Sequence, residues 1–413
     1  MNTAKHRWTF APRFRRHAFG WRSQTPIKRI KEAVSEIKKV ARKEPVVAAE
    51  GAVIFLEKVA AAIEHVDGSS GAIGTAVNNA IAALVPIIAE APADDRLRER
   101  WLERLWQAVE DDDMPYLELL PEYWGDLCVK PEIASRWADK FIGTLRFLWN
   151  PDGPRGGWFK GTYACLSALY KAGRYAELIE LVELDPHSWW SSRIWGARAL
   201  AAQGKTDEAI RFAEATHDPY ANPVSMARTC EEILLSAGLE DEAYSRYAME
   251  ANRKTTNLST FRAVAKKYPQ KKPAEILRDL VAHTPGEEGK WFAAAKSVGL
   301  YDEAIELANR TPCDPKTLTR AARDMASENP RFAAEAGLAA LRWLVAGHGY
   351  DIIGADVSGA YRHTVKAAAN AGCLPQAMPR IRALVEDASP DGFFATGILR
   401  KLLEHEPEVK GVL

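Results

Sequence analysis

Four blocks with one shared pattern recur after residue 170 and constrain the fold more than any other feature. They are AGRYAELIEL from Ala172, QGKTDEAIRF from Gln203, AGLEDEAYSR from Ala237 and VGLYDEAIEL from Val298. Their glycines lie 31, 34 and 61 residues apart, which is one or two lengths of a helix hairpin. Glycine adopts the left-handed conformation that ends a helix, and the acids after it cap or charge the start of the next helix. The blocks therefore predict successive helix hairpins.

These hairpins are expected to stack, because each pair of helices leaves one apolar face exposed. The block G-x-x-x-E-A-I resembles the turn region of tetratricopeptide (TPR-like) repeats over about residues 158–390. The matching positions are Gly173 with Tyr175, Gly204 with Ala209, Gly238 with Ala243, and Gly299 with Tyr301 and Ala304. The helix-A signature of that family is largely missing here. The resemblance implies a TPR-like α-solenoid that acts as a protein-binding scaffold rather than as a catalyst.

Residues 26–148 also have helical periodicity. In residues 26–43 an apolar stripe at three- and four-residue spacing lies on an otherwise basic helix, for which Thr25 is the expected N-cap. The segment WNPDGPRGGW then breaks helix and predicts a boundary. We therefore predict an all-α fold with a basic aromatic arm (1–25), an N-terminal helical region or bundle (26–148), a linker (149–157) and a TPR-like helical repeat domain (158–413).

One uncharged stretch, residues 68–89, is long enough to span a membrane. Asn78 and Asn79 lie in its middle, and polar groups in lipid are costly, so we favour a buried helix in a soluble protein. The chain has five widely spaced cysteines and no CxxC, which argues against a disulfide framework or a zinc site. The basic head is followed by no apolar signal-peptide region, and the expected location is cytoplasmic.

The arm contains RWTFAPRFRRHAFGWR at residues 7–22, without a single acid. Residues 1–43 carry 13 Lys or Arg against two acids, a net charge of +11, and the remaining residues carry −11. Such asymmetry indicates a basic arm with an anionic partner. The candidate binding residues are Arg7, Trp8, Arg13, Phe14, Arg15, Arg16, Trp21, Arg22, Lys28 and Arg29.

Four partners remain open for this arm. Arginine and lysine neutralise phosphates and aromatic rings stack on bases, which favours nucleic acid. The arm is also compatible with a latch whose rings fill the groove of the solenoid, or with docking to a partner protein through Trp and Arg. A membrane surface is the least favoured, because Pro12, Gly20 and Pro26 interrupt an amphipathic helix. In each case we expect an adhesive arm rather than ordinary core.

Other candidate sites have simpler explanations. Trp189, Trp190 and Trp195 are the protein-binding candidates of the repeats, with packing as the favoured alternative. Asp111–Asp113 is an acidic cluster in which Asp113 is expected to cap a helix near Met114 rather than hold a metal. Four Arg/His pairs have the spacing of helical HEPN-class ribonucleases, but both residue types favour helix ends: Arg211/His217, Arg278/His283, Arg342/His348 and Arg400/His405.

The sequence therefore predicts a non-enzymatic scaffold or adaptor, with no catalytic residue, cofactor or metal. Its solenoid is expected to bind a protein or peptide partner, and its arm an anionic partner. The alternative is a nucleic-acid-associated regulatory protein that binds DNA or RNA through residues 5–43. A helical ribonuclease is the remote alternative.

Overall fold

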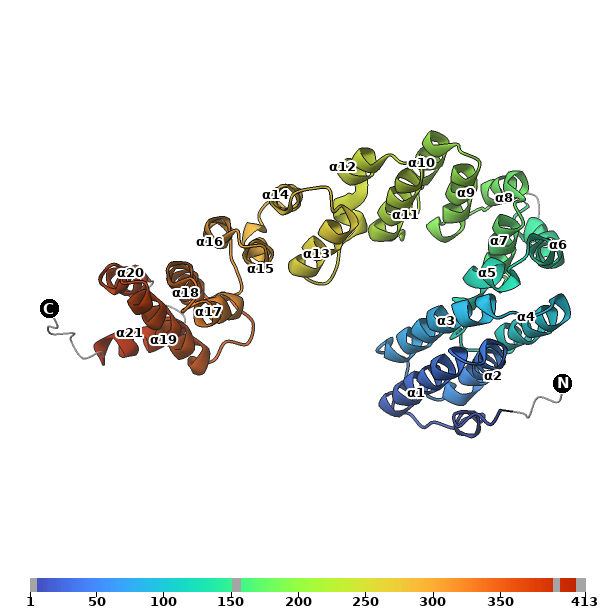
Figure 1. The fold of residues 1–413 in the computed structure, drawn as a ribbon, viewed down its shortest axis with the longest axis horizontal. Helices are drawn as coiled ribbons and strands as arrows, with labels where there is room; N and C mark the ends of the chain where they lie inside the picture. The colour runs from blue at the N-terminus through green and yellow to red at the C-terminus, as the bar shows by residue number, and fades with distance from the viewer. Residues whose placement is uncertain (1–5, 151–156, 389–393, 406–413) are drawn as a thin grey trace. The chain divides into compact units, whose positions relative to one another are not determined.

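The computed structural model describes residues 6–150, 157–388 and 394–405, and within these it contains helices and no β-strand (Figure 1). The predicted all-α class is confirmed. The chain divides into two compact units, Met1–Gly238 and Leu239–Leu413. The sequence predicts a boundary at residues 149–157, but the helices on either side of that segment, α6 and α7, pack closely together. One buried core accordingly extends from Trp8 to Ala199.

The first six α-helices of the N-terminal unit form what we call the helical bundle. Helices α1, α2 and α3 pack against one another in all three combinations, and α2 also contacts α4. Helix α5 joins α3 to α6 and α7. Their bounds are α1 Gln24–Ala41, α2 Pro45–Ile63, α3 Ala72–Glu90, α4 Asp95–Glu110, α5 Trp124–Cys128 and α6 Pro131–Leu148, with 3-10 helices η1 Ala11–Arg13 and η2 Leu120–Tyr123.

Helix α1 turns the predicted stripe to the core and exposes its lysines. Ile30 and Ile37 are buried, and the other stripe residues are half-buried against the core: Ile27, Val34 and Val40. The helix begins at Gln24 after Ser23, so the prediction of Thr25 as its N-cap is wrong. The difference is small in physical terms, because Pro tolerates any position in the first turn, where no helical N–H bond is lost.

Helix α3 is the one described helix that is long and apolar enough to cross a membrane by length and composition. Core helices pass the same test, and α3 packs on α1, α2 and α5. Its buried side chains follow one face: Ile73, Ala76, Val77, Ala80, Ile81, Leu84, Val85 and Ile88. A soluble protein is therefore compatible with this structure.

Two cations close the carboxyl ends of bundle helices. Arg98 is 4% exposed and donates to the carbonyl oxygens of Ile88 and Ala91 at the end of α3, at 2.5 and 2.9 Å. Lys160 donates to the carbonyl oxygen of Val109 at 2.9 Å and to that of Asp112 at 2.8 Å, beyond α4. Both place a positive charge and hydrogen-bond donors at the negative end of a helix dipole, and Lys160 ties the bundle to the chain that enters α7.

The segment after α4 differs from its prediction. Asp113 caps no helix, because residues 114–119 form turns and the next helical element is η2. The neighbouring Asp112 takes the structural role, and its Oδ2 accepts the backbone N–H of Leu117 at 2.6 Å. An acidic run contains several potential caps, and tertiary packing decides which one is used.

The predicted hairpins begin at α7. Their bounds in this unit are α7 Thr162–Lys171, α8 Tyr175–Glu183, α9 Trp190–Ala202, α10 Thr206–Glu214 and α11 Pro223–Ser236. The turn glycines Gly173 and Gly204 have φ of 72° and 76°, which confirms the left-handed helix ends. Five residues after each glycine, Leu178 and Ala209 are fully buried against neighbouring helices. The acids lie in the first turns without capping them through side chains.

The C-terminal unit is helical as well. Its helices are α12 Glu240–Ala251, α13 Asn257–Lys267, α14 Pro273–His283, η3 Glu288–Trp291, α15 Phe292–Ser297, α16 Tyr301–Arg310, α17 Pro315–Asp324, α18 Pro330–Val345, α19 Gly354–Asn370, α20 Leu374–Glu386 and α21 Phe394–Glu404. Gly299 turns α15 into α16 with φ of 77°, as predicted. Phe292 stacks on Phe332 at 5.9 Å between ring centroids, which joins α15 to α18.

Candidate functional site

The aromatic residues of the arm are core residues. Trp8, Phe10 and Phe14 are 5%, 2% and 1% exposed. Phe10 and Phe14 pack edge-on against Phe55 of α2, at 5.8 and 5.2 Å between centroids. The expectation of an adhesive arm is therefore wrong for these rings, and Trp8 and Phe14 do not lie on a binding surface. The arm is bound to its own chain, on α2 rather than on the repeats.

Polar contacts hold the rest of the arm to the bundle. Thr9 donates its N–H and its hydroxyl to Glu36 of α1, at 2.8 and 2.6 Å. The N–H of His17 donates to the carbonyl of Ala61 at 2.9 Å. These bonds use both helices of the α1–α2 hairpin, so the arm crosses the hairpin as an ordered layer.

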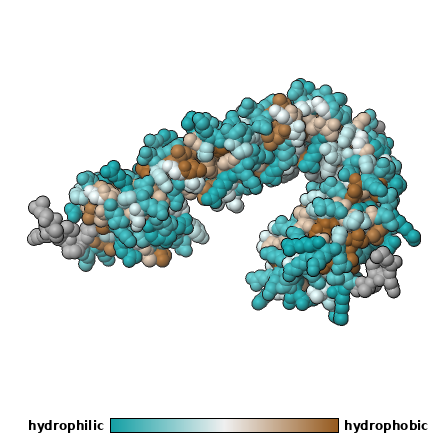
Figure 2. Space-filling view, in the orientation of Figure 1, coloured by the Kyte–Doolittle hydropathy of each residue, from teal (hydrophilic) through white to brown (hydrophobic). Residues whose placement is uncertain are grey.

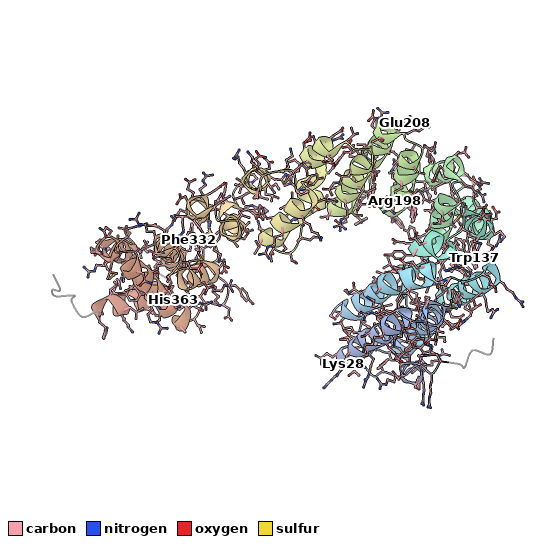
Figure 3. All side chains as sticks on the ribbon, in the orientation of Figure 1. Lys28, Trp137, Arg198, Glu208, Phe332 and His363 are labelled. Carbon is pink, nitrogen blue, oxygen red and sulfur yellow. The ribbon has the colours of Figure 1, made fainter. Side chains whose placement is uncertain are left out.

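The positive charge of the arm remains exposed. The exposed predicted residues are Arg7, Arg13, Arg15, Arg16, Trp21, Arg22 and Lys28. Arg29 is half-buried and pairs with Glu32 at 2.6 Å, and Arg13 approaches the same carboxylate at 3.3 Å. The hydrogen bond from Arg29 holds the pKa of Glu32 below its ordinary value. Lys28 points away from the bundle (Figure 3), and hydrophilic side chains project along α1 (Figure 2).

The three candidate tryptophans of the repeats do not form one surface. Trp190 is 4% exposed and donates its indole N–H to Ser225 of α11 at 3.0 Å. Trp195 is 7% exposed and packs edge-on against Tyr170 of α7. Trp189 is 44% exposed and stacks on His187 at 4.6 Å. Packing therefore accounts for Trp190 and Trp195, and Trp189 alone is a surface residue.

A groove of about 950 Å³ follows the first helices of successive hairpins in the N-terminal unit. Tyr170 of α7, Trp195 and Arg198 of α9, and Glu232 of α11 line it. The Arg198 guanidinium lies 5.4 Å from the centroid of the Trp195 ring, a cation–π arrangement. Figure 3 shows Arg198 and Glu208 on opposite sides of the α9–α10 hairpin. We call this feature the hairpin groove.

A smaller cavity of about 360 Å³ lies beside the hairpin groove, and Glu122 lines both. It is bounded by the turns after α4, by the chain that enters α7, and by the α8–α9 loop. We call it the aromatic pocket, after its ring-bearing lining residues: Trp149, Trp158, Phe159, Tyr163, His187 and Trp189. Trp158 is 74% exposed, which is unusual for so large an apolar side chain.

Two buried acids line the aromatic pocket. Asp185 is 5% exposed; its Oδ1 accepts the N–H of His187 at 3.0 Å, and its Oδ2 is buried with no hydrogen-bond partner within the described residues. Burial raises the pKa of Asp112 to about 6. Tyr163 donates its hydroxyl to Ser191 at 2.7 Å, and burial raises its pKa. Acids and rings therefore dominate this cavity.

Sequence reasoning missed this pocket. Asp185 stands in the stretch ELDPHSWW, where Asp-Pro after a helix indicates only a turn. Lys160 and Trp158 follow the predicted linker and carry no pattern of their own. Trp189 carries a signal through its ring alone, since Asp185 stands in an ordinary turn four residues before it and the other three acids of the pocket lie 67 to 77 residues away along the chain.

The described Arg/His pairs, acidic residues and cysteines do not form a recognisable catalytic or metal site. The four histidines of the Arg/His pairs lie at or just beyond the ends of α10, α14, α18 and α21. Over the part of the chain that the structure describes, no group of three or more His, Cys, Asp or Glu is placed to hold a metal ion. Burial raises the pKa of the Cys165 and Cys313 thiols to about 12.

Comparison with known proteins gives no indication of function, so the proposal below is argued from the geometry of the structure. No protein-family model matches the chain, and no curated protein matches it.

Proposed function

We propose that this protein is a non-enzymatic interaction scaffold whose hairpin groove binds an extended segment of a partner protein. The groove itself carries the proposal, because a cavity that follows α7, α9 and α11 presents one side chain after another to a peptide lying along it. The TPR-like resemblance of the turn blocks agrees with this function. The helix-end positions of the four histidines fit the simpler explanation of the Arg/His pairs, in which both residue types favour helix ends.

The lining of the groove suits a peptide of mixed charge. Glu122, Asp126 and Glu232 supply negative charge, and Lys171 and Arg198 supply positive charge. Between them, Tyr170 and Trp195 offer apolar surface of the kind that dominates binding energy at interfaces. Such a lining would select peptides by their pattern of charges and would hold them through contacts with the aromatic rings.

The basic face of the arm and α1 supports a second contact, with an anionic partner. Burial of Trp8, Phe10 and Phe14 removes the rings that base stacking would need. What remains is charge, with Trp21 as the one exposed tryptophan of the arm, at 71%. If the partner is nucleic acid, we expect contacts with its phosphates and little sequence preference.

A displayed random-peptide library selected on the full-length chain tests the groove. We expect selected peptides to lose at least tenfold in affinity for Arg198→Glu, because the charge at the groove reverses. Arg211→Glu is the matched control, since Arg211 is exposed on α10 and lies outside the groove lining. Failure to select any peptide, or equal binding to both variants, contradicts the proposal.

The nucleic-acid alternative is tested by fluorescence anisotropy with single- and double-stranded oligonucleotides across a salt series. It requires binding that weakens steeply with salt and is lost when Lys28, Lys31 and Lys39 are changed to Glu. The control changes three exposed lysines of the other unit, Lys254, Lys266 and Lys366. Binding that survives the first triple variant, or no binding at all, excludes this face as a nucleic-acid site.

A further inference from the structure

We propose that the aromatic pocket binds the guanidinium group of an arginine side chain in the partner peptide. The inference rests on the proposed function, because the pocket adjoins the hairpin groove at Glu122. A peptide in the groove can therefore place one side chain in the pocket. Three observations on the described residues lead to this ligand: a buried carboxylate oxygen without a hydrogen-bond partner, exposed aromatic rings, and a surplus of acids.

The first observation is the Asp185 carboxylate, whose negative charge a cation bound in the pocket would compensate. Its Oδ1 accepts the N–H of His187, whereas its Oδ2 is buried and has no hydrogen-bond partner among the residues that the structure describes. Buried carboxylates are ordinarily paired, because an isolated charge away from water is costly. Asp185 lines the pocket, so a cation bound there lies next to this charge and compensates it.

The rings of the pocket are exposed in a way that fits a flat cation. Trp158 and Trp189 are 74% and 44% exposed although both line a cavity. The face of a tryptophan is the best cation–π surface among the side chains. A guanidinium group is planar and stacks on such a face while its edge donates hydrogen bonds to carboxylates.

The charges of the described lining residues favour a cation over an anion in the pocket. Among the residues that the structure describes, four acids line it, Asp112, Glu118, Glu122 and Asp185, against one lysine. Lys160 is already bonded to three backbone carbonyls, those of Val109, Glu110 and Asp112. Its ammonium group is therefore committed to the end of α4, and the described lining residues together keep a net negative charge.

The test is titration of N-acetyl-arginine methylamide into the full-length chain by saturation-transfer NMR. The citrulline analogue is the matched ligand, because it has the same shape without the charge. We expect the arginine compound to bind at least tenfold more tightly than the citrulline compound. We also expect Trp189→Ala, Trp158→Ala and Asp185→Asn each to weaken arginine binding at least tenfold.

Matched variants separate a local effect from a general one. Trp21→Ala removes an exposed tryptophan of the arm, and Glu208→Gln removes an exposed acid of α10. Both are expected to bind the arginine compound as the unchanged chain does. Because Trp158 is largely exposed, its variant keeps the test informative if Asp185→Asn fails to fold. Equal binding of the two ligands, or arginine binding unaffected by Trp158→Ala and Trp189→Ala, overturns the inference.

The two proposals fail separately. If library peptides bind the groove but replacing their arginines by citrulline changes nothing, the scaffold stands and the arginine pocket is wrong. If the arginine compound binds the pocket but no library peptide is selected, the pocket stands and the scaffold proposal is wrong.

Discussion

The hairpins α7–α10 and the N-terminal arm belong to the same compact unit, yet their structures have different origins. Each hairpin turn is set by local sequence: Gly204 has φ of 76°, and Ala209, five residues later, is fully buried. The arm is set by contacts across long stretches of chain, such as Phe14 with Phe55. Local pattern therefore predicts the first region and is misleading about the second.

The misleading feature of the arm is its composition. Arginines between aromatic rings are typical of a segment that binds an external anion. The same alternation also occurs in a segment that packs its rings against the protein and exposes its arginines to solvent. In this chain the rings at 8, 10 and 14 lie against α2 while Arg7, Arg13 and Arg15 face outward. The comparison predicts that disrupting the arm costs more than disrupting a hairpin turn.

The largest expected effect is that of Trp8→Ala. Trp8 is 5% exposed and lies on the backbone of α2 at Gly51, so its loss leaves a cavity in the core. We expect the free energy of unfolding of the N-terminal unit to fall by about 3–5 kcal/mol. Urea unfolding, with hydrogen–deuterium exchange over residues 6–22 and α2, measures it.

Trp21→Ala is the matched control for that variant. Trp21 belongs to the same arm but is 71% exposed, and we expect a change of about 0.5 kcal/mol or less. Similar losses for the two variants would mean that the arm is held by its polar contacts rather than by its rings, and the comparison above would fail.

Gly51→Ala is expected to rank second. A Cβ at Gly51 overlaps the indole of Trp8, so the arm must shift, and we expect a loss of about 2 kcal/mol. Gly74→Ala on α3 is the control, because open space surrounds that position and alanine favours helix by about 0.5–1 kcal/mol. In a Trp8→Ala background the cost of Gly51→Ala should disappear. If Gly51→Ala still destabilises the Trp8→Ala variant, its cost does not come from a clash with the Trp8 indole.

These residues also show what sequence reasoning reaches. A glycine in a turn block indicates the left-handed residue that ends a helix. The all-α class and the helix ends of the repeats could therefore be predicted. Gly51 has no such local signal, since its contact with Trp8 joins residues 43 positions apart. The aromatic pocket has the same character, because its acids at 112 and 185 meet only once α4 and the α8–α9 loop are packed.

A hairpin turn is expected to tolerate change better than the arm does. Gly204→Ala places a Cβ in open space, so its cost is the left-handed backbone alone, about 1–2 kcal/mol. Gly143→Ala, within α6 and also in open space, is the control and should stabilise slightly. Thermal unfolding of the two variants gives the contrast. A loss for Gly204→Ala as large as that for Trp8→Ala would remove the distinction between local and long-range origins.

The smallest effect concerns Asp112, at the junction of the bundle and the first hairpin, and it depends on pH. Burial raises the pKa of this carboxyl to about 6 from an ordinary 3.8, so the folded chain holds the proton more tightly than the unfolded chain does. Ionising Asp112 therefore opposes folding; the penalty is complete above about pH 6 and vanishes towards pH 4. Asp112→Asn removes the penalty and keeps an acceptor for the N–H of Leu117.

The stability advantage of Asp112→Asn should shrink by about 1 kcal/mol between pH 7 and pH 5. Urea unfolding of both proteins at the two pH values isolates this residue, because all other carboxyl groups titrate alike in the pair and cancel in the difference. A difference in unfolding free energy that is the same at both pH values would show that water reaches Asp112. The junction would then be open, and the pocket that Asp112 lines would be too wet for its acids to act as buried charges.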